Sequence, residues 1–233
     1  MWMDNWVLNQ PFFSWPRSPD ESVRSHQRVL YRFFEARRPA IVLSSSNQPS
    51  IETFEDTCAQ LQIPILQRRG GGGTVLLGPG CLILTFAFYA KDVFSNQRYF
   101  ALINDLWAQS LSHVGLHGLT TRGHSDLAKG ERKIAGTSLF RRKHLVVYQG
   151  SLLVSPDFQL IERVLRHPSR EPDYRDGRSH RDFLVSAHEL GYLGTTAALA
   201  AHCSSFFREH VHAHLQADFA DEAVLPGHQT SGH

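Results

Sequence analysis

The chain has 233 residues, 42% of them hydrophobic, which is enough for a single domain with a full core. Its formal net charge of +2 gives no case for nucleic acid as a bulk partner, and no apolar run approaches the length that spans a membrane. The three cysteines are far apart and lack a zinc-binding spacing, so we expect a reducing, cytoplasmic compartment. We expect one domain over residues 1–217 and a flexible tail over residues 218–233.

The first part of the chain is expected to alternate between helices and short strands. After an irregular aromatic arm over residues 1–18, a proline in the first turn and the spacing of apolar residues predict a helix from Ser18 to Phe34. The apolar run of residues 40–43 predicts a buried strand. Ser50 is a suitable cap for a second helix. The expected apolar face of that helix consists of Ile51, Phe54, Cys58 and Leu61.

The rest of the chain is expected to contain hairpins and three helices. Helices are expected from Ser95 to Gly115, over residues 155–165 and over residues 195–215, while residues 167–182 have the polar composition of a surface loop. Seven segments have the apolar pattern of strands, namely residues 63–66, 74–77, 82–88, 116–121, 126–128, 133–140 and 145–154. Because the hairpins break strict strand–helix alternation, the pattern favours an α+β fold over a doubly wound one.

Four consecutive glycines, Gly70–Gly73, lie between the pair Arg68 and Arg69 and the apolar run that begins at Thr74. Ordering glycine costs more backbone entropy than ordering any other residue, and glycine has no side chain to bury. Such a loop is useful where the main chain must approach a ligand closely, because its N–H groups can hold carbonyl or phosphate oxygens beside a fixed positive charge. The alternative is a flexible turn between two strands.

A second unusual stretch lies in the strand expected over residues 133–140. Lys133 precedes an apolar residue and the small residues Gly136, Thr137 and Ser138. A lysine at this place is either a charge on a strand edge or a cation held beside an anionic ligand, and the small residues would let a bulky ligand lie across the strand.

Together these stretches resemble the lipoate–protein ligase and octanoyltransferase branch of the biotin/lipoate protein ligase superfamily. The glycine loop is similar to the family segment R-R-x-x-G-G-G-[AT]-V, and residues 133–138 are similar to K-[IV]-[SA]-G-[ST]-[AS], which carries the family's essential lysine. Gly123–Asp126 resembles G-R-N-D, with His124 and Ser125 in place of Arg and Asn. Residues 149–153 resemble H-G-[ST]-L-L. The resemblance covers about residues 28–190.

The resemblance implies a mixed β-sheet flanked by helices, as in class II aminoacyl-tRNA synthetases and biotin ligases, with the acyl chain in a bent tunnel. It implies that lipoate is activated with ATP and Mg²⁺ to lipoyl-AMP and passed to a lysine of an acceptor lipoyl domain. Lys133 would then lie between the α-phosphate and the acyl carbonyl. Asp126 would contact Mg²⁺ or the adenylate, or would merely cap its strand. Residues expected to bind the acyl-adenylate are Arg68 or Arg69, Gly71, Gly72, Gly73, Thr74, Val75, Asp126, Gly136, Thr137, Ser138 and Gly150.

Two departures from the family pattern leave alternatives open. The long ligases carry a further C-terminal domain, so adenylation here could require a separate accessory subunit, proceed unaided, or be replaced by a preactivated donor. A transferase would take its acyl group from acyl carrier protein or another lipoyl protein through a cysteine, but no cysteine occupies either family position, and Cys81 matches neither. This favours the ligase.

A non-catalytic role, biotin ligation and the polar loop within residues 173–180 remain to be considered. A non-catalytic subunit that binds lipoyl domains would have little use for Lys133 and the glycine loop, and the quadruple glycine fits biotin ligation less well. The arginines within residues 173–180 could steer an acidic acceptor, although a plain solvated loop explains them too.

Overall fold

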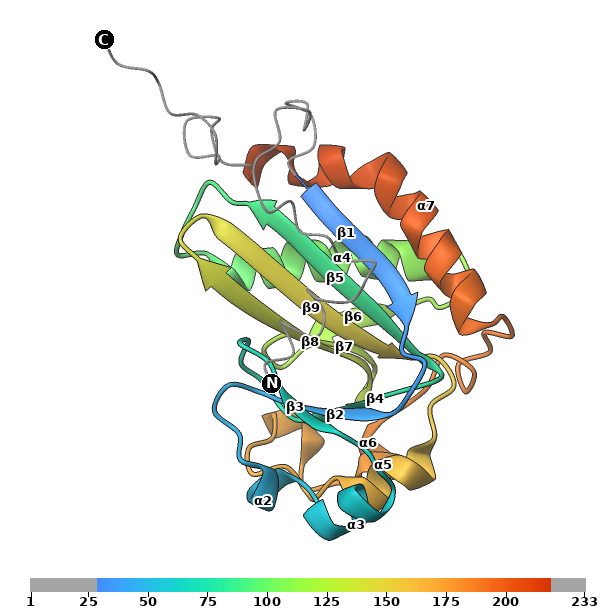
Figure 1. Ribbon diagram of the computed structural model, residues 1–233. Coiled ribbons are helices and arrows are strands. Elements are labelled where there is room, and N and C mark those ends of the chain that lie inside the picture. Colours follow the sequence, from blue (N-terminus) through green and yellow to red (C-terminus); the bar gives the residue numbers. More distant parts are fainter. Residues whose placement is uncertain (1–28, 219–233) are drawn as a thin grey trace.

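The structure is a computed structural model that describes residues 29–218, and it contains two β-sheets with helices on their outer sides (Figure 1). The larger sheet is antiparallel throughout and has the strand order β1-β5-β9-β8-β7-β6. The smaller sheet, in the order β3-β2-β4, is mixed, because β2 pairs in parallel with β3 and antiparallel with β4. The strands are β1 (Val29–Glu35), β2 (Ala40–Leu43), β3 (Ile65–Gln67), β4 (Val75–Leu77), β5 (Cys81–Tyr89), β6 (Leu119–Arg122), β7 (Asp126–Lys129), β8 (Arg132–Arg142) and β9 (Leu145–Leu153).

The helices fall into two groups. The long helices α4 (Asn96–Ser112) and α7 (Thr196–Leu215) pack on one face of the larger sheet, where Trp107 and Phe207 share a core with Phe33 and Phe86. Near the smaller sheet lie short helices, namely α2 (Pro49–Glu52), α3 (Glu55–Gln60), α5 (Phe158–Val164), η1 (Asp173–Arg175) and α6 (His180–Phe183); η2 (Gln216–Asp218) follows α7. The expected combination of a mixed sheet and flanking helices is therefore confirmed, with the strands divided between two sheets.

The alternation of side chains along β9 explains how the larger sheet serves two purposes. Tyr148 and Leu152 point into the core beneath α4 and α7, whereas Gln149, Ser151 and Leu153 line a cavity on the opposite face. Successive residues of a strand project to opposite faces, so one strand builds both the core and the cavity wall. The core face fixes the strand, and the cavity face is free to carry polar side chains.

The helix expected up to Phe34 is wrong over the described residues, because residues 29–35 form the edge strand β1. Each residue of β1 pairs with β5, from Val29 opposite Phe88 to Glu35 opposite Leu82. Val29 and Phe33 are buried and Tyr31 packs against the same core, while Leu30 is 42% exposed, so every second residue faces the core, as in a strand. Pairing with a distant strand has overridden the local helical spacing. The start of the expected helix and the aromatic arm lie outside the described residues.

The single helix expected from Ser50 is instead two short helices separated at Thr53. Thr53 forms a β-bridge with Leu165, and the next amide, of Phe54, donates to the carbonyl of Val164. These bonds to a distant segment use backbone groups that a continuous helix would need. As a result Ile51 is 49% exposed, and Cys58, at 1%, is the one member of the expected apolar face that is buried.

The other expected elements occur within a few residues of their predicted bounds. Thr195 caps α7 by accepting from the amide of Ala198, and Gly115, with φ of +90°, lies just beyond the end of α4. Asp218, where the tail was expected to begin, is buried and forms an ion pair of 2.5 Å with Arg98; residues 219–233 lie outside the described part. No helix within residues 29–218 has the length and apolar character needed to cross a bilayer.

Candidate functional site

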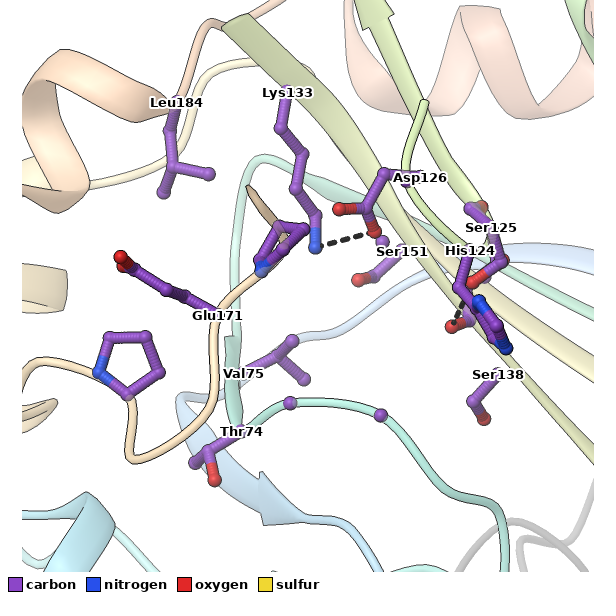
Figure 2. A pocket seen from close by; sticks show the side chains of 18 of the residues that line it. Thr74, Val75, His124, Ser125, Asp126, Lys133, Ser138, Ser151, Glu171 and Leu184 are labelled. Carbon is purple, nitrogen blue, oxygen red and sulfur yellow. Dashed lines mark hydrogen bonds and ion pairs between the residues drawn. The ribbon is translucent and has the colours of Figure 1, made fainter. Parts of the chain in front are cut away.

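A cavity of about 910 Å³ lies between the two sheets, and the glycine loop, the turn at Gly123–Asp126 and the strands that carry Lys133 and Gly150 meet in it (Figure 2). Its walls come from the glycine loop and β4 (residues 72–77), from residues 121–126, which include the turn between β6 and β7, and from β8 and β9. Its apolar part is lined by side chains of both sheets and α5, including Phe34, Val42, Leu77, Ile83 and Ile161. The cavity thus has a polar wall and an apolar wall, which suits an amphipathic ligand.

Arg68 lines this cavity and fixes the glycine loop, whereas Arg69 does not line it. The guanidinium of Arg68 is buried, and its Nη2 donates to the carbonyl oxygens of Gly71 and Gly73, each at 2.7 Å. Gly72 between them has a φ of +98°, a conformation that favours glycine. Arg69 is exposed and stacks over the ring of Phe140 at 5.5 Å.

Lys133 extends from β8 into the cavity, where its Nζ forms an ion pair of 2.8 Å with Oδ1 of Asp126 on β7 (Figure 2). The register of β7 and β8 shifts beside it, since Leu127 faces Ala135 but Ala128 faces Lys133. An extra residue of this kind bends a strand and redirects its side chains. The backbone of Lys133 is also held, because its carbonyl accepts from the amide of Val185 at 2.9 Å.

Both carboxylate oxygens of Asp126 have partners within the protein. Lys133 takes Oδ1, and the hydroxyl of Tyr174 donates to Oδ2 at 3.0 Å. Within residues 29–218 no group of three His, Cys, Asp or Glu side chains is arranged to hold a metal ion. Asp126 therefore fits Mg²⁺ poorly as a resident ligand, since a single carboxylate already engaged by a cation would have to be released first.

Two of the glycines expected to bind the acyl-adenylate, Gly136 and Gly150, have protein side chains close to the place where a Cβ would lie. A Cβ on Gly136 would lie 2.9 Å from Nζ of Lys133, so this glycine lets the lysine cross its own strand. A Cβ on Gly150 would lie 2.5 Å from the ring of Trp107 in the core, away from the cavity face of β9. Close packing against Trp107 thus explains why Gly150 lacks a side chain, whereas at Gly136 the neighbour is the flexible end of Lys133.

Every expected binding residue except Arg69 and Gly71 lines the cavity. The cavity wall includes Arg68, Gly72, Gly73, Thr74, Val75, Asp126, Lys133, Gly136, Thr137, Ser138 and Gly150. Among the described residues no cysteine does so. Cys58, Cys81 and Cys203 are all buried elsewhere, and burial raises the pKa of Cys81 and of Cys203 to about 11. A thiol in that state is a poor nucleophile at neutral pH.

Residues 167–182 are not the plain surface loop that their composition predicted. The segment contains η1 and α6, and it covers one end of the cavity with a row of residues from Arg170 to Arg175. Arg175 is only 4% exposed, and its Nε lies 3.3 Å from the carboxylate of Glu171. Because the segment carries many charges, its sequence did not indicate that part of it packs against the site.

Sequence reasoning also missed a buried hydrogen-bond network that supports the turn at residues 123–126. Asn104 of α4 is fully buried, accepts from the hydroxyl of Tyr148 at 2.6 Å and donates to the carbonyl of Ser125 at 2.9 Å. That carbonyl also accepts from the hydroxyl of Thr137 at 2.7 Å. The only local signal was the polar pair Asn104 and Asp105 between the buried residues Ile103 and Leu106 of α4, which is a weak indication.

We expect Asn104→Leu to lower the free energy of unfolding by about 1–3 kcal/mol, because the hydroxyl of Tyr148 loses its buried acceptor. Urea-induced unfolding, followed by fluorescence, measures this loss. The matched control is the double variant Asn104→Leu/Tyr148→Phe, in which both partners are apolar. It should regain part of the lost stability, and a double variant with the summed loss of both single variants would contradict the network.

Three comparisons place this chain among known proteins. The family described as "Lipoyl protein ligase A/B catalytic domain" matches residues 15–193. Lipoate–protein ligase 1 of Staphylococcus aureus is 27% identical over 137 residues, which cover 58% of this chain and 40% of the relative. The chain spans less than half the length of the curated relatives that it matches.

Two solved structures share the fold. The bipartite lipoate protein ligase of Thermoplasma acidophilum, described with its E2 lipoyl domain, superimposes with a TM-score of 0.68 at 20% identity, over 79% of this chain and 71% of that one. Lipoate-protein ligase A bound with ATP gives a TM-score of 0.66 at 19% identity, over 79% and 73% of the two chains. With a family match that covers most of its length, this chain belongs to the lipoyl protein ligase A/B catalytic domain family.

Proposed function

We propose that this chain is the catalytic unit of a lipoate–protein ligase, which activates lipoate with ATP to lipoyl-AMP and transfers the lipoyl group to a specific lysine of an acceptor lipoyl domain. The observation that carries the proposal is the position of Lys133, whose ammonium lies in the same cavity as the glycine loop, beside a wall of apolar side chains. An acyl-adenylate has the matching composition, an apolar chain joined to a charged phosphate.

In the first step an oxygen of the lipoate carboxylate attacks the α-phosphorus of ATP, the bond to the β-phosphate breaks, and pyrophosphate leaves. In the second step the amine of the acceptor lysine attacks the acyl carbonyl, loses one proton, and displaces AMP. Negative charge grows on the phosphate and then on the carbonyl oxygen. We propose that Lys133, Arg68 and the N–H groups of residues 72–74 stabilise that charge.

ATP and Mg²⁺ enter this proposal in different ways. The polar wall of the cavity fits the phosphates of the nucleotide, and lipoate-protein ligase A is a relative of this fold that was solved with ATP. Mg²⁺ prefers to keep several waters and to bind through substrate phosphates. We therefore propose that it arrives with ATP, and that Asp126 serves the site first through Lys133.

The ligase is preferred over the thioester-dependent transferase because no cysteine of the described residues lines the cavity. An acyl-enzyme would need a nucleophile there, and an unassisted serine is much weaker than a thiolate at neutral pH. The acceptor is proposed to be a lipoyl-domain protein, in line with the Thermoplasma ligase and its E2 lipoyl domain. The bipartite character of that ligase also motivates testing a separate accessory subunit.

Mass spectrometry of an acceptor lipoyl domain tests the proposal directly. With lipoate, ATP and Mg²⁺, we expect one lipoyl mass to be added to the acceptor. A second reaction supplies preformed lipoyl-AMP, which removes the need for adenylation and hence for any accessory subunit. A third supplies octanoyl-acyl carrier protein. Transfer from that donor, with none from lipoate plus ATP or from lipoyl-AMP, would overturn the ligase in favour of the transferase.

A further inference from the structure

The side chain of Tyr174 links the segment that covers the cavity to β7, the strand that carries Asp126. It lies in η1, and its hydroxyl reaches Oδ2 of Asp126 at 3.0 Å. The other oxygen of that carboxylate holds Nζ of Lys133 at 2.8 Å. Three side chains from η1, β7 and β8 therefore form one line of contacts along the cavity wall.

The ring of Tyr174 is fixed on several sides. It packs against Phe183 of α6 with ring centroids 5.1 Å apart, and the guanidinium of Arg122 lies 5.3 Å from its centre. Gly123 allows the close approach of this ring, because a Cβ there would come within 3.3 Å of it. Packing of this kind leaves the hydroxyl little freedom, so its direction toward Asp126 is set by the fold.

The hydroxyl of Tyr174 stays protonated, as a hydrogen-bond donor to Asp126 must. Burial, and next the negative charge of Asp126, raise the pKa of Tyr174 above its ordinary value. The hydroxyl thus keeps its proton throughout the physiological range. A hydrogen bond from a hydroxyl to a carboxylate is charge-assisted, and together with the ion pair of Lys133 it holds both carboxylate oxygens of Asp126.

We propose that Tyr174 is a positioning residue for Lys133: its hydroxyl holds the carboxylate of Asp126 in the orientation that keeps the lysine ammonium over the cavity. Tyr174 need not touch substrate for this role. The inference deepens the proposed function and rests on it for the meaning of Lys133. It also makes the placement of the lysine depend on the segment that covers the cavity, since that segment supplies the tyrosine.

The reactivity of Lys133 toward acetic anhydride, measured by mass spectrometry of peptides at several pH values, tests this without lipoate or ATP. The amine nitrogen is held against the carboxylate at 2.8 Å, so it can attack the anhydride only when that contact is broken. Asp126→Asn should therefore make Lys133 more reactive, and Tyr174→Phe should shift its reactivity toward that of Asp126→Asn. Tyr192→Phe is the matched control, because its hydroxyl contacts the carbonyl of Thr195 outside the cavity.

Unchanged or lower reactivity of Lys133 in Tyr174→Phe, or unchanged reactivity in Asp126→Asn, would overturn the inference. In the transfer assay Tyr174→Phe should lower kcat about 10-fold, the effect of one charge-assisted hydrogen bond, with the KM for lipoate within about twofold of wild type. A change in KM alone would overturn it too. If the wild-type chain transferred no lipoyl group but the labelling shifted as expected, the proposed function would be wrong, and the positioning of Lys133 by Tyr174 through Asp126 would still be supported.

Discussion

Lys133→Ala is expected to reduce lipoyl transfer by about 10²–10³-fold, the loss that follows removal of one preorganised charge donor from a developing anion. Lys133 lies in the cavity, and its Nζ reaches Asp126 at 2.8 Å, so its ammonium is already held where the proposed adenylate would lie. The initial rate of mass addition to the acceptor domain measures the effect. Preformed lipoyl-AMP, used in a single turnover, separates the transfer step from adenylation.

Lys129→Ala is the matched control for this variant. Lys129 ends β7, is exposed, donates to the carbonyl of His117 at 2.8 Å and does not line the cavity. Its loss removes the same charge from the same hairpin and should leave the rate unchanged. The two side chains of this ion pair are only 22% and 14% exposed, and Lys133→Ala leaves Asp126 with the hydroxyl of Tyr174 as its partner, so we expect the free energy of unfolding to fall by about 1–3 kcal/mol with the fold retained. Turnover near the wild-type rate in a folded Lys133→Ala variant would remove this residue from the mechanism.

Gly80→Ala is expected to give the largest loss of stability, about 2–5 kcal/mol, from a strained backbone and a direct clash. Gly80 has a φ of +82°, and a Cβ there would lie 2.1 Å from the backbone oxygen of Ser155. Its own carbonyl accepts from the amides of Val154 and Ser155, and its amide donates to Glu35. One residue thus ties the start of β5 to the ends of β9 and β1, and the clash cannot relax without breaking these bonds.

Gly115→Ala separates the two causes. Gly115 has a similar φ of +90°, but a Cβ there would meet nothing within 4 Å. Backbone strain alone should then cost about 1–2 kcal/mol. Urea-induced unfolding of both variants gives the comparison, and the difference between them measures the clash with Ser155. Equal losses in the two variants would show that the backbone near Ser155 yields freely.

The parts of the site that could be predicted from the sequence are those that a short stretch of chain determines by itself. The glycine loop and the strand that carries Lys133 could be recognised by their unusual composition, and both contribute residues to the cavity wall. The strand β1 was missed because its conformation depends on pairing with β5, and the break at Thr53 depends on Leu165. Tyr174 was missed for the same reason, since its role exists only through a contact with Asp126, distant in the sequence.

The role of Gly150 shows a different limit. A glycine beside a suspected ligand site suggests space for the ligand, but the space is filled by Trp107 from α4. The direction in which an absent side chain would point depends on strand register, and register is decided by which neighbours pair. Sequence reasoning located the residue at the cavity wall and assigned it the wrong neighbour.

The hydrogen bonds of Arg68 have a consequence for how tightly any phosphate can bind. Its guanidinium is engaged by the carbonyls of Gly71 and Gly73, which act as internal competitors for an incoming anion. A ligand that takes those donors must turn the two carbonyls elsewhere, so part of its interaction energy goes into reshaping the backbone and its net affinity falls. Glycine keeps that change inexpensive, because it tolerates many φ and ψ values. The glycine run thus allows Arg68 to exchange the carbonyls of Gly71 and Gly73 for the oxygens of a phosphate.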